Sequence, residues 1–148
     1  MLTKTTKPTR RRGMLLSLEM VIALPILILV FVGAVEFTFL LLASQAITAA
    51  ANVGARQATL PSATSADVED AVYAALSSWR WANSPDLQVQ VYVLPDNDTL
   101  LQNAITGTPV QVTITMPSTT AAPDLLGIIP VLSIKNQTLT STFVSRKE

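Results

Sequence analysis

Residues 15–43 read LLSLEMVIALPILILVFVGAVEFTFLLLA, and only two of these residues carry a charge. Within this stretch Met20–Val35 is an uncharged run, about 24 Å long as a helix at about 1.5 Å per residue. A bilayer core of about 30 Å needs about 20 apolar residues, and the apolar flanks supply the remainder. The run is too long, and the rest of the 148-residue chain too small, for a buried soluble core. We therefore expect one membrane-spanning helix.

The charges of the chain are segregated on the two sides of this helix. Overall 49% of the residues are hydrophobic and 14% are charged, against about 25% charged in a typical globular domain. Residues 43–148 hold five basic and eight acidic residues, a net charge of −3. Residues 1–13 hold no acid and five basic residues, namely Lys4, Lys7, Arg10, Arg11 and Arg12. Basic residues are retained in the cytoplasm, so Arg10, Arg11 and Arg12 predict an inner-membrane protein with its amino terminus inside and its C-terminal domain extracytoplasmic.

A cleavable signal peptide is the alternative explanation of this start. Ser44-Gln45-Ala46 places small residues where a signal peptidase favours them. The apolar region of a signal peptide normally spans about 7–15 residues, whereas this one approaches thirty and contains two glutamates. A secreted protein cleaved near Ala46 stays open as the less favoured hypothesis.

The two glutamates in the apolar run are energetically unfavourable in lipid. A carboxylate at the bilayer centre costs on the order of 3 kcal/mol. Glu19 lies near the cytoplasmic boundary, and Glu36 lies 17 residues further on, about 25 Å along a helix and near the opposite boundary. Both could reach interfacial water. For Glu36 a packing role is an equal alternative, and for Glu19 the nearby basic tail favours a specific partner.

Four short motifs share one resemblance. RRRG, SLEMVIALP, GAVEF and QAITAAANVGAR follow one another between about residues 10 and 58. In this order they resemble the TadE-like family of the tight-adherence (Flp) pilus system. The matching positions are Glu19, Pro25, Gly33, Glu36, Phe37, Gln45, Ala46, Gly54 and Arg56.

The resemblance implies a non-enzymatic minor pseudopilin. It implies that a prepilin peptidase cuts after Gly13 and leaves Met14 as the new amino terminus. It also implies that Glu19 pairs with the N-terminal amine of a neighbouring subunit. Glu36, from its place in the apolar run, is the second candidate for subunit packing. Glu19 is the sixth residue counted from Met14, whereas the family usually has its glutamate at the fifth.

The implied partners are the lipid bilayer, other pilin or pseudopilin subunits, the pilus assembly machinery and a prepilin peptidase. The implied roles are assembly of an adhesive pilus, cell adhesion and secretion, at the inner membrane or in a cell-surface pilus. A hypothesis from another class is a membrane-anchored extracytoplasmic binding module.

The remaining sequence predicts a small α+β domain of pilin-like type. Ala-rich sequence extends the helix to about residue 59, and small residues at Ala43, Ser44, Ala46, Ala49, Ala50 and Ala51 would admit neighbouring helices. Apolar spacing predicts a second helix over 65–80, with Thr64 and Asp67 as a capping box. Alternation and β-rich composition predict antiparallel strands over 87–94, 109–116 and 132–144, with 117–123 as a loop. The expected organisation is a basic cytoplasmic leader (1–13), the membrane helix with its extension (14–60) and the extracytoplasmic α+β domain (61–148).

The sequence offers little for catalysis or metal binding. It contains no Cys and no His, which removes thiolate chemistry, the commonest general base and the commonest metal ligand. Asp96-Asn97-Asp98 resembles the opening of a calcium loop, but the glycine and the distant glutamate of that motif are missing, so we expect a turn. The basic tail beside a membrane segment indicates topology rather than nucleic-acid binding. We predict no catalytic residue, no cofactor and no metal.

Overall fold

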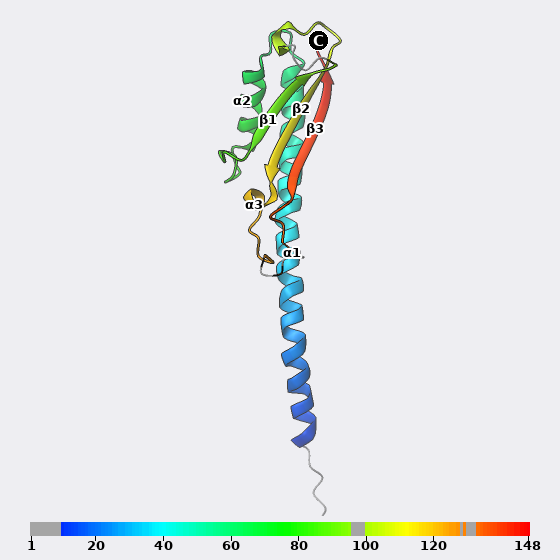
Figure 1. Ribbon diagram of the computed structural model, residues 1–148, viewed down its shortest axis with the longest axis vertical. Helices are drawn as coiled ribbons and strands as arrows, with labels where there is room; N and C mark the ends of the chain where they lie inside the picture. The colour runs from blue at the N-terminus through cyan, green and yellow to red at the C-terminus, as the bar shows by residue number, and fades with distance from the viewer. Residues whose placement is uncertain (1–9, 96–99, 128, 130–132) are drawn as a thin grey trace, which may run out of the picture.

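The computed structural model describes residues 10–95, 100–127, 129 and 133–148, with side chains from residue 19 onward. A long helix, α1 (Arg10–Ala58), forms the spine of the molecule (Figure 1). A small head of helix and sheet lies against its second half, while most of its first half extends below the head (Figure 1). This arrangement confirms the predicted α+β class with a long N-terminal helix.

Helix α1 is continuous over 49 residues, about 73 Å at about 1.5 Å per residue. It contains Pro25, which has no N–H to donate to the carbonyl of Val21. The helix closes with Arg56 in its last turn, whose carbonyl accepts a hydrogen bond from the Thr59 N–H at 3.2 Å. Pro61 follows two residues later, and the chain turns back there.

Helix α2 (Ser65–Leu76) starts at the predicted capping box. The Asp67 N–H donates to the Thr64 hydroxyl oxygen at 3.2 Å, and the Thr64 N–H donates to Asp67 Oδ2 at 2.8 Å. The helix ends four residues earlier than predicted. Two serines follow Leu76, and serine is a weaker helix former because its side chain competes for backbone hydrogen bonds.

The sheet contains three antiparallel strands in the order β1-β2-β3. They are β1 (Gln88–Val93), β2 (Pro109–Pro117) and β3 (Thr138–Arg146). The third strand begins at Thr138 rather than at the predicted residue 132, because the chain first makes a turn in which the Gln137 N–H donates to the Ile134 carbonyl at 3.0 Å.

Two short helices complete the described elements. They are the 3-10 turn η1 (Leu101–Asn103) and α3 (Ser118–Ala121), a single turn within the predicted 117–123 loop. The predicted turn at Asp96-Asn97-Asp98 lies outside the described residues, so nothing tests it.

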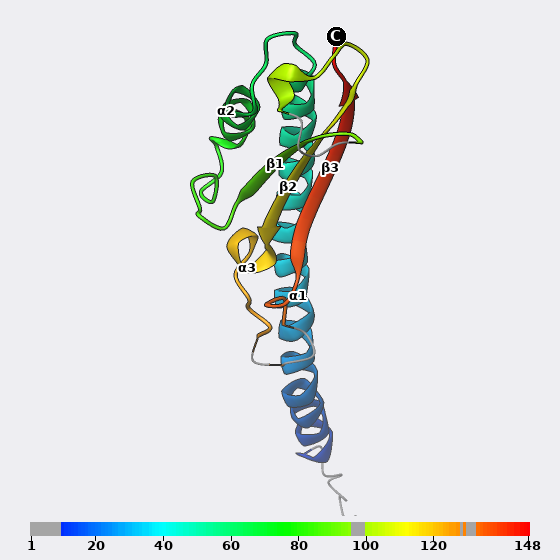
Figure 2. The same cartoon turned by 45° about the horizontal axis from the view of Figure 1, so that its top comes forward.

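The core lies between the sheet and the second half of α1. One face of β2 is fully buried, through Val110, Val112, Ile114 and Met116. Helix α2 packs beside the sheet on α1 (Figure 2) and buries Val68, Val72 and Leu76. On α1 the buried residues facing this core are Ala43, Ile47, Ala50, Ala51, Ala55 and Ala58.

Three of the small residues expected to admit neighbouring helices are therefore covered by the chain itself. Ala43, Ala50 and Ala51 have essentially no exposed surface. Their small side chains let the strands of the same chain approach the helix closely.

Candidate membrane helix and packing site

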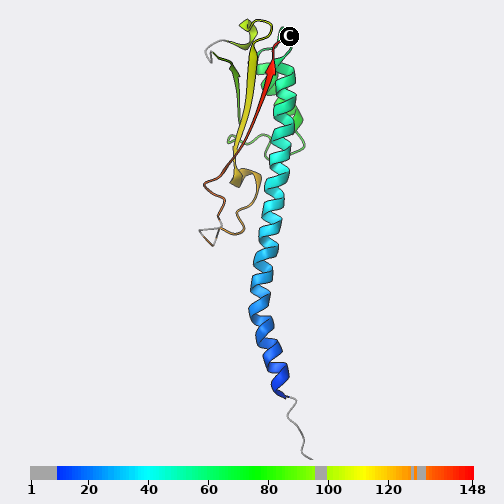
Figure 3. The ribbon, with the colours of Figure 1, turned by 90° about the vertical axis from the view of Figure 1, so that its right-hand side faces the viewer.

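The first half of α1 presents apolar side chains to its surroundings. It is the one helix among the described residues that is long and apolar enough to cross a membrane. Seen from the side, nothing in the head covers its lower turns (Figure 3). Its large exposed apolar residues are Met20, Val21, Ile22, Leu24, Ile26, Leu27, Ile28, Leu29, Val30 and Phe31. Bare apolar surface of this extent needs a lipid or protein partner, and the helix indicates membrane anchoring.

The predicted topology and processing residues belong to the first turns of this helix. Arg10, Arg11, Arg12, Gly13 and Met14 have helical backbone, and their side chains lie outside the described part of the structure. Their predicted roles in topology and processing stay predictions.

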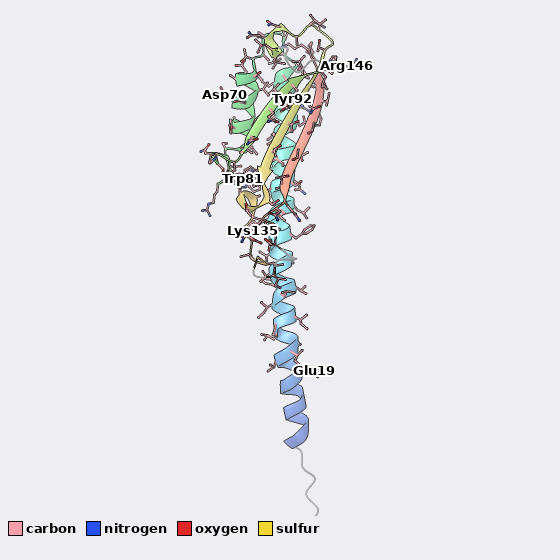
Figure 4. The ribbon with its side chains drawn as sticks, in the orientation of Figure 1. Glu19, Asp70, Trp81, Tyr92, Lys135 and Arg146 are labelled. Carbon is pink, nitrogen blue, oxygen red and sulfur yellow. The ribbon has the colours of Figure 1, made fainter. Side chains whose placement is uncertain are left out.

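Glu19 lies on the bare part of the helix. Its side chain is exposed, and Figure 4 shows it far below the head. Among the described residues, none donates a hydrogen bond or supplies a cation to its carboxylate. Glu19 is therefore open to a partner from another chain.

Glu36 is in the opposite situation. Its side chain is only 3% exposed, although the next residue of the helix, Phe37, is exposed. Its Oε2 accepts a hydrogen bond from the backbone N–H of Leu126 at 3.2 Å. Its Oε1 is also buried and has no hydrogen-bond partner in the described part of the chain. Glu36 thus packs within its own chain, on a segment that follows α3, instead of extending to interfacial water.

Two glycines from the recognised motifs allow close approach to α1. A Cβ on Gly33 would lie 3.3 Å from Leu126 Cδ1. A Cβ on Gly54 would lie 2.6 Å from Val72 Cγ2, closer than side-chain carbons approach one another. Gly33 therefore admits the Leu126 segment, and Gly54 admits α2.

An aromatic pocket lies at the lower end of the head, beside α1. It encloses about 710 Å³, and its walls include Phe39, Trp79, Arg80 and Trp81. The rings of Trp79 and Trp81 are tilted by 31° with centroids 5.4 Å apart. Figure 4 places Trp81 near α3. The sequence analysis did not identify this pocket; the triplet Trp79-Arg80-Trp81 was the signal that could have pointed to it.

No group of three or more His, Cys, Asp or Glu side chains is placed to hold a metal ion among the described residues. The features that the site does offer are a bare apolar half-helix, an open glutamate and a glutamate that ties a distant loop to the helix. These features define an α+β protein with a long, exposed apolar helix, and each of them is suited to packing against lipid or protein.

In a comparison with known families, most of helix α1 matches one family model. The family model described as TadE-like protein matches residues 16–56, which confirms the resemblance predicted from the motifs. The matched segment contains Glu19, Gly33, Glu36 and Gly54 and begins after the predicted cleavage position. TadE-like proteins are a pilus-associated structural family, so the match indicates involvement in a Tad pilus system. No curated protein and no solved structure matches this chain.

Proposed function

We propose that this protein is a TadE-like minor pseudopilin, a non-enzymatic component that takes part in assembly of a tight-adherence pilus. The observation that carries the proposal is the coincidence of the family match with a helix whose first half exposes most of its large apolar side chains. The helix anchors the subunit in the inner membrane and packs against the helices of other pilins.

The orientation follows from the charges that flank the apolar run. Five basic residues precede it without an acid, and the 43–148 segment carries a net charge of −3. The positive-inside rule puts the first group in the cytoplasm and the head outside. The continuity of α1 through Ala46, with Ile47 fully buried in the head, favours retention of the helix over secretion.

Glu19 supplies the specific contact between subunits. An unpaired carboxylate in hydrocarbon costs on the order of 3 kcal/mol, and a buried ammonium is similarly unfavourable. Pairing the two offsets much of both costs. Cleavage between Gly13 and Met14 would create such an ammonium at the terminus of each mature subunit. Because every residue in a helix adds about 100° of rotation and 1.5 Å of rise, the sixth position of Glu19 sets a register one residue away from that of a fifth-position glutamate.

Intact-mass spectrometry of the protein purified from its native membrane tests the processing step. A mature chain that begins at Met14 supports the pseudopilin. A chain that begins at Ile47 would mean secretion, and an uncut chain would mean a fixed anchor. Protease added to spheroplasts should digest the head; protection of the head would contradict the orientation.

Replacement of Glu19 tests helix packing. Glu19→Ala should abolish co-purification with the other pilus subunits, because it leaves the neighbouring amine unpaired. Leu27→Ala, a change at an exposed apolar position of the same helix, is the matched control and should retain co-purification. If the Glu19→Ala protein co-purified as well as the control, Glu19 would have no part in assembly.

A further inference from the structure

The segment after α3 follows α1 away from the head. We call its described residues, Pro123–Gly127 and Ile129, the apolar loop; Figure 1 and Figure 3 show the chain descending beside α1 below the sheet. Leu125, Leu126 and Ile129 form one wall of a groove of about 420 Å³. The other wall belongs to α1 and consists of Leu24, Pro25, Ile28, Leu29 and Val32.

The position of the groove along α1 gives its depth. Val32 and Leu24 lie about 6 and 18 Å below Glu36, at about 1.5 Å per residue. If the basic cluster ends at the inner membrane surface, the outer boundary of a hydrocarbon core of about 30 Å falls near Glu36. If Glu19 marks the inner boundary instead, the outer one falls beyond Glu36. In both alignments the groove lies within the hydrocarbon: it extends from the outer half to about the midplane in the first, and it is centred near the midplane in the second.

Four backbone N–H groups of the apolar loop, those of Leu125, Leu126, Gly127 and Ile129, have acceptors within the chain. Polar backbone groups in lipid need partners from the protein. The Leu125 N–H donates to the Pro123 carbonyl at 2.9 Å, and the Ile129 N–H to the Leu126 carbonyl at 2.9 Å. The Leu126 N–H donates to Glu36 Oε2. Glu36 therefore supplies the hydrogen-bond acceptor that the Leu126 N–H would lack in lipid.

The neck of the loop is polar, as expected at a headgroup layer. Asp124 Oδ2 accepts a hydrogen bond from the Ser133 hydroxyl at 2.9 Å and lies 3.8 Å from Lys135 Nζ. The Lys135 side chain is 69% exposed, and Figure 4 shows it beside α1 just below the head. A lysine in this position can extend its ammonium to lipid phosphates while its stem follows apolar surface.

We propose that the apolar loop is a second membrane element, embedded in the outer leaflet, and that the groove holds a lipid acyl chain. Leu125 is 44% and Ile129 37% exposed, so both retain surface for hydrocarbon contact. That surface is continuous with the exposed apolar residues of α1 at the same depth, which selects lipid as the occupant. The proposal rests on the membrane insertion of α1 proposed above. The head is then held to the bilayer at two points, and extraction of the subunit must withdraw the loop together with the helix.

The absence of cysteine from the chain makes the test direct. Single substitutions Leu125→Cys and Ile129→Cys are labelled with an environment-sensitive fluorophore on the full-length protein in phosphatidylcholine–phosphatidylglycerol vesicles. Leu27→Cys, on the exposed face of α1, is the lipid reference. Ile105→Cys, 77% exposed near the opposite end of the head, is the water reference. Quenching by aqueous iodide and by acyl-chain nitroxide lipids is measured for each label.

The labels at 125 and 129 should behave like the label at 27: quenched by nitroxide lipids, protected from iodide and shifted to shorter emission wavelength. Iodide quenching as strong as at 105 would overturn the proposal, since the loop would lie in water. Protection from both quenchers would also overturn it, because the groove would then hold another protein segment. If the label at 27 were itself in water, the membrane anchoring would fail as well; failure at 125 and 129 alone leaves the anchoring intact.

Discussion

Replacing Gly54 with alanine adds one methyl group at a point where α1 and α2 pack closely. The new Cβ would lie 2.6 Å from Val72 Cγ2 and 3.4 Å from both Val68 Cγ1 and Val112 Cγ1. Carbon atoms in good contact are about 3.5–4.0 Å apart, so one of the two nearest atoms must move by about 1 Å. Val72 is fully buried and, being β-branched, has few alternative rotamers. The strain therefore has to separate the helices.

The expected change in the free energy of unfolding is the difference between a packing cost and a gain in helix propensity. Overpacking a core by a methyl group costs about 1–3 kcal/mol. Alanine in place of glycine within a helix stabilises by up to about 1 kcal/mol. We expect a net loss of about 1 kcal/mol, which lowers the melting temperature of a domain of this size by about 4–8 °C.

The assay is thermal unfolding of the full-length protein in detergent, followed by tryptophan fluorescence. Ala49→Gly at an exposed position of α1 measures the helix-propensity term in the same helix. Adding Val72→Ala to Gly54→Ala should recover part of the loss, so that the double variant loses less than the sum of the single changes. The steric argument is refuted if Gly54→Ala raises the melting temperature by as much as Ala49→Gly lowers it.

Four further results are expected. Thr64→Ala removes the cap of α2 and should cost about 1 kcal/mol in urea unfolding; an unchanged midpoint would contradict the cap. The Thr64 hydroxyl, and then its backbone N–H, lower the pKa of Asp67 below its usual 3.8. The resulting stabilisation is present above about pH 4 and lost as the pH falls through the lowered pKa, so Asp67→Asn should flatten that part of the stability profile. Glu36→Ala leaves the Leu126 N–H without its acceptor, which costs about 1–3 kcal/mol and should speed hydrogen exchange there; Glu36→Gln, which keeps an oxygen, is the control, and equal exchange in both would refute the contact. Trp81→Ala should cost about 3–5 kcal/mol because the ring is almost fully buried, and a smaller loss than that of Trp79→Ala, at the half-buried second tryptophan, would be inconsistent with the fold.

The elements that sequence predicted well are those with a strong local period or composition. The apolar run and its Ala-rich extension correspond to α1. The alternation of PVQVTITM corresponds to β2, with every second residue from Val110 buried. The Thr64–Asp67 capping box involves only neighbouring residues, and the structure confirms that α2 starts there. The end of α2 and the start of β3 were misplaced, because turns and packing at those points override the periodic pattern.

The contacts of the candidate site were harder to predict from the sequence. Glu36 was known to be costly in lipid, but its partner is a backbone N–H 90 residues away. A backbone donor carries no side-chain signature, so neither composition nor spacing could name it. For the same reason the aromatic pocket was missed, since it joins Phe39 to Trp81 and α3 across the fold.

Sequence alone determined that this chain has one long apolar helix, a basic start and a TadE-like pattern of residues, because hydrophobicity, charge and motif spacing are properties of the chain in order. Only the tertiary structure decided which of the motif residues contact other segments of the same chain and which stay exposed. Gly54 packs against α2 and Glu36 against the apolar loop, whereas the Glu19 side chain is exposed and has no partner among the described residues. The physical reason is that burial and hydrogen bonding depend on which distant segment returns to the helix, and the return path is set by the packing of the whole head.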